Sequence, residues 1–262
     1  EAFDVSADAS NFALLLDMGT GKTKVTLDTV GYLFEKSKIE FVLVVAPKGV
    51  IPNWIPEIEA HLPPRIEREV VLWNPSLSKQ RRDELNDLHT KRSKLKFMLM
   101  NVEAFSTKKG TDVAELFVKR FKTFMVVDES TTIKNRKAKR TKALCAVGRE
   151  AVYRRILTGS PVTRSPLDLF SQMAFLDPKI LGFSSFYAFQ GRYSIVQRRT
   201  MGAHSFNHVV GFRRLDELTD KLSKHSFRVK KEDCLDLPDK VYTKRTVALT
   251  VEQHIAYAQM KK

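Results

Sequence analysis

The residues Asp17-Met18-Gly19-Thr20-Gly21-Lys22-Thr23-Lys24 have the types and the spacing of a phosphate-binding loop. Its two glycines allow backbone N–H groups to close around phosphate oxygens, and the N-terminus of a following helix adds a positive dipole end. The amine of Lys22 can reach the outer phosphates of a nucleotide, and the hydroxyl of Thr23 can ligate magnesium. Leu16 stands where the usual pattern has its first glycine. Taken alone, the segment therefore also fits an ordinary glycine turn with a solvated lysine.

Two further polar segments supply the groups that a phosphate loop lacks. Asp128 and Glu129 follow the apolar run 124–127. Asp128 is suited to hold magnesium, and Glu129 is suited to polarise an attacking water. Thr158, Gly159 and Ser160 follow another apolar run, and their hydroxyls could hydrogen-bond the acids and report the state of the outermost phosphate, although a plain turn has the same composition. Together the three segments predict ATP and Mg²⁺ as cofactors and Lys22, Asp128 and Glu129 as catalytic residues.

The first 160 residues alternate short apolar runs with segments of helical spacing. The runs cover residues 12–16, 41–46, 69–73, 97–101, 124–127 and 153–157, and the helical segments include 22–35, 51–61 and 138–148. Near-continuous apolar strands that alternate with helices are typical of a parallel sheet covered on both faces. We therefore expect an α/β fold with the polar segments at the carboxyl ends of the strands, where such folds bind nucleotides.

The pattern changes after about residue 165. Helices are expected at 166–176, 184–190 and 215–222, and short strands at 226–231 and 241–249, whereas 191–212 is basic and aromatic without a clear period. We expect one domain over 1–235, with a helical and basic insertion at about 180–222, followed at 236–262 by a linker and the start of a second body.

Composition favours a polyanionic partner. The chain of 262 residues has 45 Lys and Arg against 30 Asp and Glu, a net charge of +15. Basic residues cluster at 79–96 and 134–142, which favours nucleic acid over an anionic membrane, although solvated charges on a basic globular protein remain an alternative. The chain has 43% hydrophobic residues, no apolar run of membrane length and only two cysteines, Cys145 and Cys234. We expect an intracellular globular protein without a disulfide framework, and a fragment, because no Met begins it.

Other residue groups allow two readings each. The basic and aromatic side chains of 192–208 form either a DNA-contacting insertion or a solvated loop with aromatic anchors: Arg192, Tyr193, Arg198, Arg199, His204, Phe206 and His208. The basic segment 134–142 either lines a nucleic-acid path or is the exposed side of a helix. Trp54 and Trp73 are expected in the core rather than stacked on bases.

The motifs together resemble the first RecA-like lobe of superfamily-two helicase-like ATPases, specifically the Swi/Snf branch. In that family too the first glycine of the phosphate loop is usually absent. Segments that resemble further family motifs are Val45-Ala46-Pro47 with Trp54 and Glu57, Met100 to Glu103, Asp128 to Asn135, Leu157 to Pro161, Val229 to Lys240, and Thr250 to Met260. The resemblance covers nearly the whole chain. Ser130 and Thr131 depart from it, because the family usually has Ala and His there.

The resemblance implies a RecA-like P-loop NTPase lobe that hydrolyses ATP, is stimulated by DNA, and moves along duplex DNA or remodels protein–DNA complexes. It implies nucleic-acid contacts at Pro47, Lys48, Asn101, Lys134, Asn135 and Arg136, and coupling of ATP state to DNA by Thr158, Gly159 and Ser160. It also implies a second RecA-like lobe that supplies arginine fingers, so these 262 residues alone are expected to turn over ATP very slowly. A strand-separating DNA or RNA helicase and a catalytically silent nucleic-acid-binding module are the alternatives.

Overall fold

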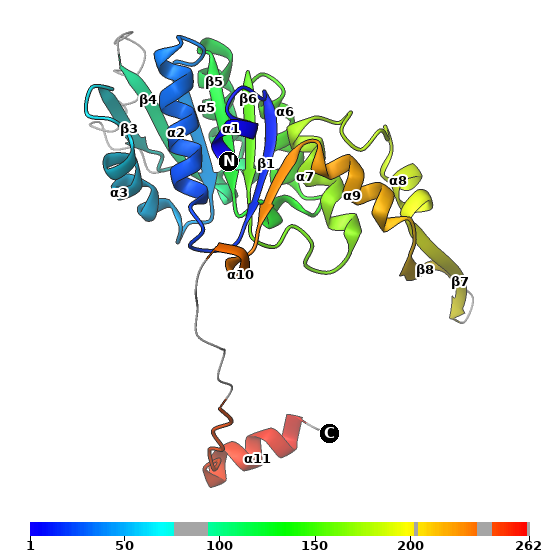
Figure 1. Cartoon of the computed structure of the whole chain (residues 1–262). Coiled ribbons are helices and arrows are strands. Elements are labelled where there is room, and N and C mark those ends of the chain that lie inside the picture. The colour runs from blue at the N-terminus through cyan, green and yellow to red at the C-terminus, as the bar shows by residue number, and fades with distance from the viewer. Residues whose placement is uncertain (76–93, 202–203, 235–242, 261–262) are drawn as a thin grey trace.

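A seven-stranded, fully parallel sheet forms the centre of the computed structural model, which describes residues 1–75, 94–201, 204–234 and 243–260 (Figure 1). The strands are β1 (Asn11–Leu16), β2 (Phe41–Ala46), β3 (Arg68–Leu72), β4 (Leu95–Asn101), β5 (Thr123–Asp128), β6 (Tyr153–Leu157) and β9 (Ser226–Val229). Their order across the sheet is β3-β4-β2-β5-β6-β1-β9. The expected parallel sheet is confirmed, and its strands β2 and β6 have the predicted bounds.

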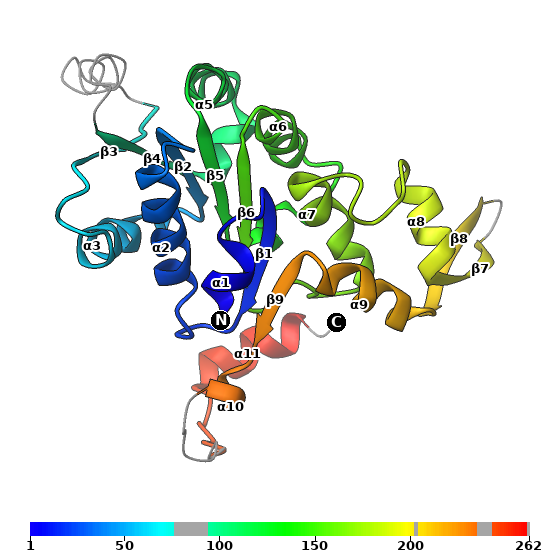
Figure 2. The same ribbon diagram turned by 45° about the horizontal axis from the view of Figure 1, so that its top comes forward.

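Helices cover both faces of this sheet, because its strands carry apolar side chains on both faces and these must be buried. On one face α2 (Lys22–Glu35) and α3 (Ile51–His61) bury Leu27 and Ile58 against strand residues such as Val44. On the other face lie α5 (Lys108–Arg120), α6 (Lys139–Gly148) and α7 (Leu169–Leu176). Figure 2 shows the two groups of helices on opposite sides of the strands. Four of the six residues of β2 are Val or Leu and all six are buried, as a central parallel strand requires.

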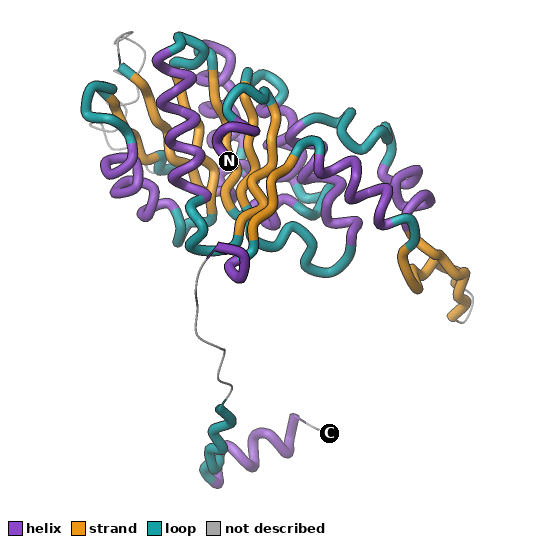
Figure 3. The backbone as a smooth tube through the Cα atoms, viewed as in Figure 1, coloured by secondary structure: helices purple, strands orange, loops and turns teal. Residues whose placement is uncertain are grey.

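The region after the sheet contains a structure that the sequence reading missed. After α8 (Phe186–Tyr193), the strands β7 (Ser194–Met201) and β8 (His204–Phe212) pair antiparallel, and α9 (Leu215–Ser223) leads back to β9. The expectation that 191–212 is irregular is therefore wrong. The residues of β7 that are described after Ser194 are exposed. Their sequence therefore lacks the alternation of apolar and polar residues by which a half-buried strand is detected. Figure 3 shows this hairpin projecting from the body.

The chain ends in short helices, α10 (Lys231–Cys234) and α11 (Val251–Met260). The family resemblance of Thr250 to Met260 implies a helix in that segment, and α11 confirms it. The strand expected at 241–249 is wrong for residues 243–249, which have no regular structure. The boundary expected between 235 and 236 and most of the basic cluster 79–96 lie outside the described residues. Short elements complete the fold: α1 (Ala2–Ser6), η1 (Val102–Ser106), η2 (Ser130–Ile133) and η3 (Pro166–Asp168).

Two sequence expectations about covalent and membrane features can be compared with this structure. Cys145 and Cys234 are both free thiols. Within the described ranges, no helix combines the length and the apolar character needed to cross a bilayer. Likewise, no cluster of three or more potential metal ligands from His, Cys, Asp and Glu occurs in the described part.

A buried arginine fixes the first ten residues to the sheet. The side chain of Arg155 in β6 is 1% exposed, and its guanidinium donates to the carbonyl oxygens of Ser6 at 2.6 Å, Arg154 at 2.9 Å and Ser10 at 3.3 Å. No carboxylate pairs with it among the described residues, and burial lowers the pKa of Arg155 to about 10. The guanidinium is therefore still charged at neutral pH, and the backbone carbonyls provide the compensation for its burial.

Replacement of this arginine should destabilise the protein. Arg155→Ala removes a charged donor from the carbonyl groups of Ser6 and Ser10, each of which keeps one backbone donor, the N–H of Ala9 at 3.2 Å and of Arg154 at 2.7 Å. A hydrogen bond to a charged group contributes about 1.5–3 kcal/mol. We expect a loss of about 2–4 kcal/mol in the free energy of unfolding, measured by urea denaturation. The exposed Arg149→Ala is the control and should change it by less than about 0.5 kcal/mol. An equal loss in both variants would contradict this role of Arg155.

Candidate nucleotide-binding site

Three neighbouring strands end side by side and bring the polar segments together. In the order β5-β6-β1, the pair Asp128 and Glu129 follows β5, residues 158–160 follow β6, and the glycine loop follows β1. Because the strands are parallel, all three segments leave the same edge of the sheet. Residues separated by more than 100 positions in the sequence thereby form one site.

The glycine loop adopts a conformation that needs its glycines. Gly19 has φ +82° and Gly21 has φ +90°, which is a left-handed region that L side chains rarely adopt. Gly21 is also the N-cap of α2, so the backbone turns directly into the first helical residues, Lys22 and Thr23. No atom lies within 4 Å of a Cβ built on either glycine. The loop therefore keeps open space in front of a helix N-terminus, where a phosphate group is favoured.

Lys22 is folded against the loop that it follows. Its amine donates to the carbonyl oxygens of Leu16 at 2.8 Å and Asp17 at 3.1 Å. These contacts hold the positive charge within the loop, on the side of the two acids, since Lys22 lowers the pKa of both Asp128 and Glu129. Neutral carbonyl groups are weaker partners than phosphate oxygens, so the amine can exchange them for a nucleotide.

The carboxylate of Asp128 is buried and held by two donors. The residue is 6% exposed; its Oδ1 accepts from the backbone N–H of Glu129 at 2.9 Å, and its Oδ2 accepts from the indole N–H of Trp54 at 3.1 Å. Burial raises the pKa of Asp128, and the two donors together with Lys22 oppose that shift. Trp54 is 1% exposed, as expected for a core residue, but its role in orienting this carboxylate was not predicted.

Glu129 leaves the strand in an unusual backbone conformation. Its φ and ψ are 48° and 58°, a left-handed region that non-glycine residues seldom adopt. Glu129 is also the N-cap of η2, so the chain turns out of the strand at this residue. Burial and the neighbouring Asp128 raise the pKa of Glu129, while Lys22 lowers it. A strained residue with a perturbed carboxyl group is typical of a functional site.

The two acids and the phosphate loop border one cavity of about 280 Å³. Its lining combines the glycine loop, the acid pair and one face of α3: Met18, Gly19, Lys22, Thr23, Val50, Asn53, Trp54, Glu57, Asp128 and Glu129. The structure therefore places Trp54 and Glu57 beside the acids. A lysine, a hydroxyl and three carboxylates around one cavity fit a nucleoside triphosphate with Mg²⁺.

Other members of the expected phosphate loop do not line this cavity. The side chain of Lys24 pairs with Asp28 at 2.6 Å on the outside of α2. The hydroxyl of Thr20 donates to the carbonyl of Asp17 and closes the turn. Asp17 turns away from the acids, because its Oδ2 accepts from the backbone N–H of Lys231 at 3.1 Å. These three residues shape and anchor the loop.

The segment of Thr158, Gly159 and Ser160 packs directly behind the glycine loop. A Cβ added at Gly159 would lie 3.2 Å from the Cα of Asp17, which is closer than most Cβ contacts, so a larger residue would require the glycine loop to shift by a few tenths of an ångström. The hydroxyl of Thr158 accepts from the backbone N–H of Ser160 at 3.2 Å. Among the described residues, no hydrogen bond joins Thr158 or Ser160 to the acids.

A glutamine that the sequence reading did not identify connects the acid box to the segment after β6. The hydroxyl of Ser130 donates to Oε1 of Gln172 at 2.7 Å, and Nε2 of Gln172 donates to the carbonyls of Pro161 at 2.7 Å and Asp168 at 2.9 Å. Gln172 is fully buried on α7. A lone glutamine inside an apolar helix was the available signal, since a buried amide needs partners.

The expected nucleic-acid contacts lie at this edge of the sheet as well. Pro47 and Lys48 follow β2, Asn101 ends β4, and residues 134–136 follow η2. Their side chains differ in freedom: Lys48 and Asn135 are exposed, whereas Asn101 caps η1 through the N–H of Ala104.

The basic residues after η2 are partly engaged. Lys134 donates to the hydroxyl of Thr163, and the guanidinium of Arg136 lies 4.2 Å from the ring centre of Phe186. Half of the segment 134–142 belongs to α6, whose exposed positions include Lys139 and Lys142. Both earlier readings of this segment therefore remain compatible with the structure.

Comparison with known proteins assigns this architecture to a family. The family model described as SNF2-related domain matches residues 6–262. A probable ATP-dependent DNA helicase, CHR23, of Arabidopsis thaliana is 30% identical over 189 residues, which are 69% of this chain and 16% of that protein. The transcription regulatory protein SNF2 of Saccharomyces cerevisiae is 27% identical over 96% of this chain and 14% of its own length. The chain thus spans about a sixth of these relatives.

A solved structure supports the same assignment. The SWI2/SNF2 ATPase core of Sulfolobus solfataricus in complex with dsDNA has a TM-score of 0.63 and 25% identity, and the match covers 98% of this chain and 49% of that one. The RecA-like fold expected from the resemblance is confirmed, with its parallel sheet and its helices on both faces. The chain belongs to the SNF2-related family of helicase-like ATPases.

Proposed function

We propose that this chain is the N-terminal ATPase lobe of an enzyme that hydrolyses ATP to ADP and phosphate in response to duplex DNA and moves along the duplex or remodels protein–DNA complexes. The observation that carries the proposal is the single cavity bordered by Lys22, Thr23, Asp128 and Glu129. The Sulfolobus relative in complex with dsDNA and the net charge of +15 support duplex DNA as the partner.

Each residue of the cavity has a separate role in this proposal. The amine of Lys22 leaves its carbonyl partners and neutralises charge on the β- and γ-phosphates, and Thr23 with Asp128 holds Mg²⁺. The bound Mg²⁺ supplies charge neutralisation of the phosphates. Glu129, whose pKa is raised by burial and by Asp128, orients the attacking water and accepts its proton. Trp54 positions Asp128 through its indole N–H.

The cavity lacks one group that fast phosphoryl transfer uses. No arginine lines it among the described residues. An arginine that contacts the γ-phosphate is typically worth about 10³–10⁵ in rate. We propose that a second RecA-like lobe supplies it, so residues 1–262 by themselves bind ATP weakly and hydrolyse it slowly.

The catalytic role of Glu129 can be tested in the natural, full-length protein. Glu129→Gln keeps the size of the side chain but removes the base, and we expect the DNA-stimulated kcat to fall by about 10²–10⁴ while ATP still binds. Glu35→Gln, at the far end of α2, is the control and should retain activity. An unchanged kcat in Glu129→Gln would show that the assignment is wrong. The rates with duplex DNA, single-stranded DNA and RNA, with a strand-displacement assay, separate a translocase from a strand-separating helicase.

Trp54 provides a test of the magnesium ligand. Trp54→Phe keeps an aromatic ring in the core but removes the donor to Asp128, and a hydrogen bond to a charged group contributes about 1.5–3 kcal/mol. We expect kcat/KM for Mg²⁺-ATP to fall about 10- to 100-fold, with a higher Mg²⁺ requirement.

The protein contains a matched control for this variant. Trp73 is also buried, but its indole N–H has no hydrogen-bond partner among the residues that the structure describes. Trp73→Phe should therefore leave kcat/KM within about twofold. Equal losses in the two variants would mean that ring packing, and not the bond to Asp128, is what Trp54 contributes.

We also propose that Gln172 helps to couple nucleotide state to DNA, together with Thr158, Gly159 and Ser160. Gln172→Met keeps the volume of the side chain but breaks the link between Ser130 and the carbonyl of Pro161. We expect the ratio of DNA-stimulated to basal ATPase rate to fall about two- to tenfold, as the loss of about 0.5–1.5 kcal/mol implies. Gln190→Met on α8 is the control, and thermal melting of both variants checks the fold. A ratio that stays constant in Gln172→Met would exclude the coupling role.

A further inference from the structure

The hairpin of β7 and β8 is a basic ribbon that the ATPase site does not use. It extends beyond α8 and α9, away from the sheet and, in Figure 1, on the side of the molecule where the strands of the sheet end. The whole segment 191–214 contains five arginines and no Asp or Glu. Arg198 and Arg199 lie in the middle of β7, are exposed, and have no carboxylate within ion-pair distance among the described residues.

The pairing of the strands distributes the two arginines over both faces of the ribbon. Arg198 is opposite Asn207, and Arg199 is opposite Phe206. Because successive side chains of a strand point to opposite faces, one guanidinium lies on each face. A two-stranded ribbon has the dimensions that the major groove of B-DNA admits, and the groove has phosphates along both walls. A charge on each face therefore suits a ribbon between two rows of phosphates.

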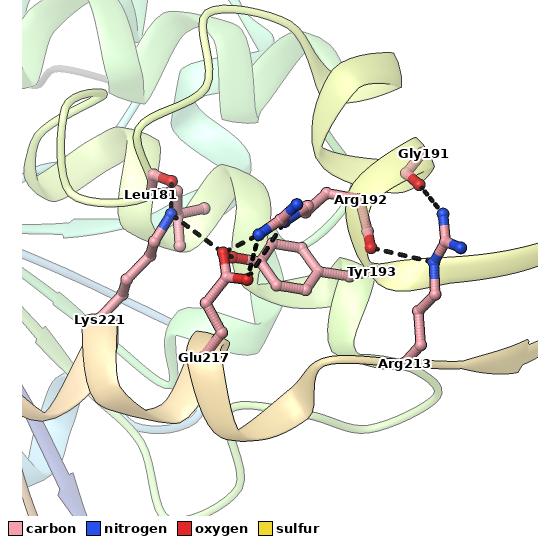
Figure 4. Close-up of polar contacts among 7 residues, drawn as sticks. All are labelled: Leu181, Gly191, Arg192, Tyr193, Arg213, Glu217 and Lys221. Atoms are coloured by element: carbon pink, nitrogen blue, oxygen red, sulfur yellow. Dashed lines mark hydrogen bonds and ion pairs between the residues drawn. The ribbon is translucent and has the colours of Figure 1, made fainter.

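Polar contacts hold the hairpin at its base, both where β7 begins and where β8 ends (Figure 4). A simple solvated loop would not require such contacts. Where β7 begins, Glu217 of α9 accepts from Arg192 at 2.6 Å and from the hydroxyl of Tyr193 at 3.0 Å. Lys221 approaches the same carboxylate at 3.6 Å and donates to the carbonyl of Leu181 at 3.1 Å. Burial and Glu217 together raise the pKa of Tyr193 to about 12, so its hydroxyl remains a donor at neutral pH.

Where β8 ends, Arg213 forms hydrogen bonds with the end of α8. The guanidinium of Arg213 donates to the carbonyl oxygens of Gly191 at 2.7 Å and Arg192 at 3.3 Å, as Figure 4 shows. Tyr193 itself is fully buried and packs on Phe183 and Phe189. An isolated two-stranded ribbon is marginally stable in water. The contacts of Glu217 and Arg213 stabilise this ribbon and fix its direction relative to α8 and α9. Arg192 and Tyr193 were grouped by sequence with the basic and aromatic residues of 192–208. In the structure they hold the base of the hairpin in place.

We propose that the β7–β8 hairpin is a second duplex-DNA contact, in which Arg198 and Arg199 bind backbone phosphates on the two walls of a groove. This inference rests on the proposed function, because it assumes that duplex DNA is the partner of the lobe. The contact is independent of sequence, since it involves phosphates and no base edges. It increases the hold on the duplex without taking part in the chemistry.

Salt-dependent DNA binding by the natural, full-length protein tests this contact. Each phosphate contact adds about 0.9 to the slope of log K against log salt concentration. The double variant Arg198→Ala/Arg199→Ala should therefore lower that slope by about 2 and raise the Kd for duplex DNA roughly tenfold or more at 0.1 M salt. Arg198→Lys/Arg199→Lys should restore most of the affinity, because the charge is kept.

The control removes two charges from the opposite end of the sheet. Lys38 and Lys122 are exposed and precede β2 and β5, so Lys38→Ala/Lys122→Ala changes the net charge equally, far from the carboxyl edge. It should leave the slope unchanged within about 0.5. Equal slopes for the hairpin variant and the unmodified protein would overturn the inference, and so would equal losses in the hairpin and control variants.

A crosslinking experiment identifies what the ribbon touches. A photoreactive amino acid at Thr200, which is exposed near the tip, should crosslink to duplex DNA in an ATP-independent manner. Crosslinks only to another part of the protein would overturn the inference and leave the proposed function standing. If the unmodified protein neither binds duplex DNA nor responds to it in ATPase rate, the proposed function fails as well.

Discussion

The parallel pairing of β5, β6 and β1 is the constraint on which the site depends. The register places Asp128 beside Leu157 and Leu14 beside the same residue, and β1 continues to Leu16, so the three chain segments leave the sheet at the same edge. Helices must then return the chain to the other edge before each new strand, which is why α2 and α6 cover the faces. The close contact of Gly159 with Asp17 follows from this arrangement, and a Cβ at position 159 would require the two segments to move apart by a few tenths of an ångström.

The acid box combines stable packing with a conformation that is unfavourable by itself. Asp128 is desolvated at the end of a fully buried strand, and Glu129 is held at a positive φ directly after it. Both features raise the free energy of the folded state, and the surrounding contacts must offset them: Trp54 on Oδ2, the Glu129 N–H on Oδ1, and Lys22 nearby. The result is a pair of carboxyl groups that differ in burial, which suits the separate roles proposed for them in metal binding and proton transfer.

The fold was predicted from the sequence where the pattern was strong, and the site where motifs marked it. Runs such as 41–46 can only be buried parallel strands or buried helices, and the glycine loop and acid pair settled which. Trp54 and Gln172 were not recognised as part of the site because their roles depend on partners 74 and 42 residues away. The hairpin was missed for a different reason. Residues 195–200 of β7 are exposed and do not alternate between apolar and polar, so the side-chain period that marks a half-buried strand is absent there. Contacts of Glu217 and Arg213, which lie outside the two strands, hold the hairpin.

The phosphate loop is also connected to the segment that leaves the sheet. The N–H of Asp17 donates to the carbonyl of Val229 at 3.1 Å, and its carboxylate accepts from the N–H of Lys231. The loop therefore shares its first residue with the end of β9, where α10 begins. A change at the glycine loop and a change in the direction of the chain after β9 act on the same two hydrogen bonds. Asp17, which lies outside the cavity, thus joins the glycine loop to the chain that follows β9 through these two hydrogen bonds.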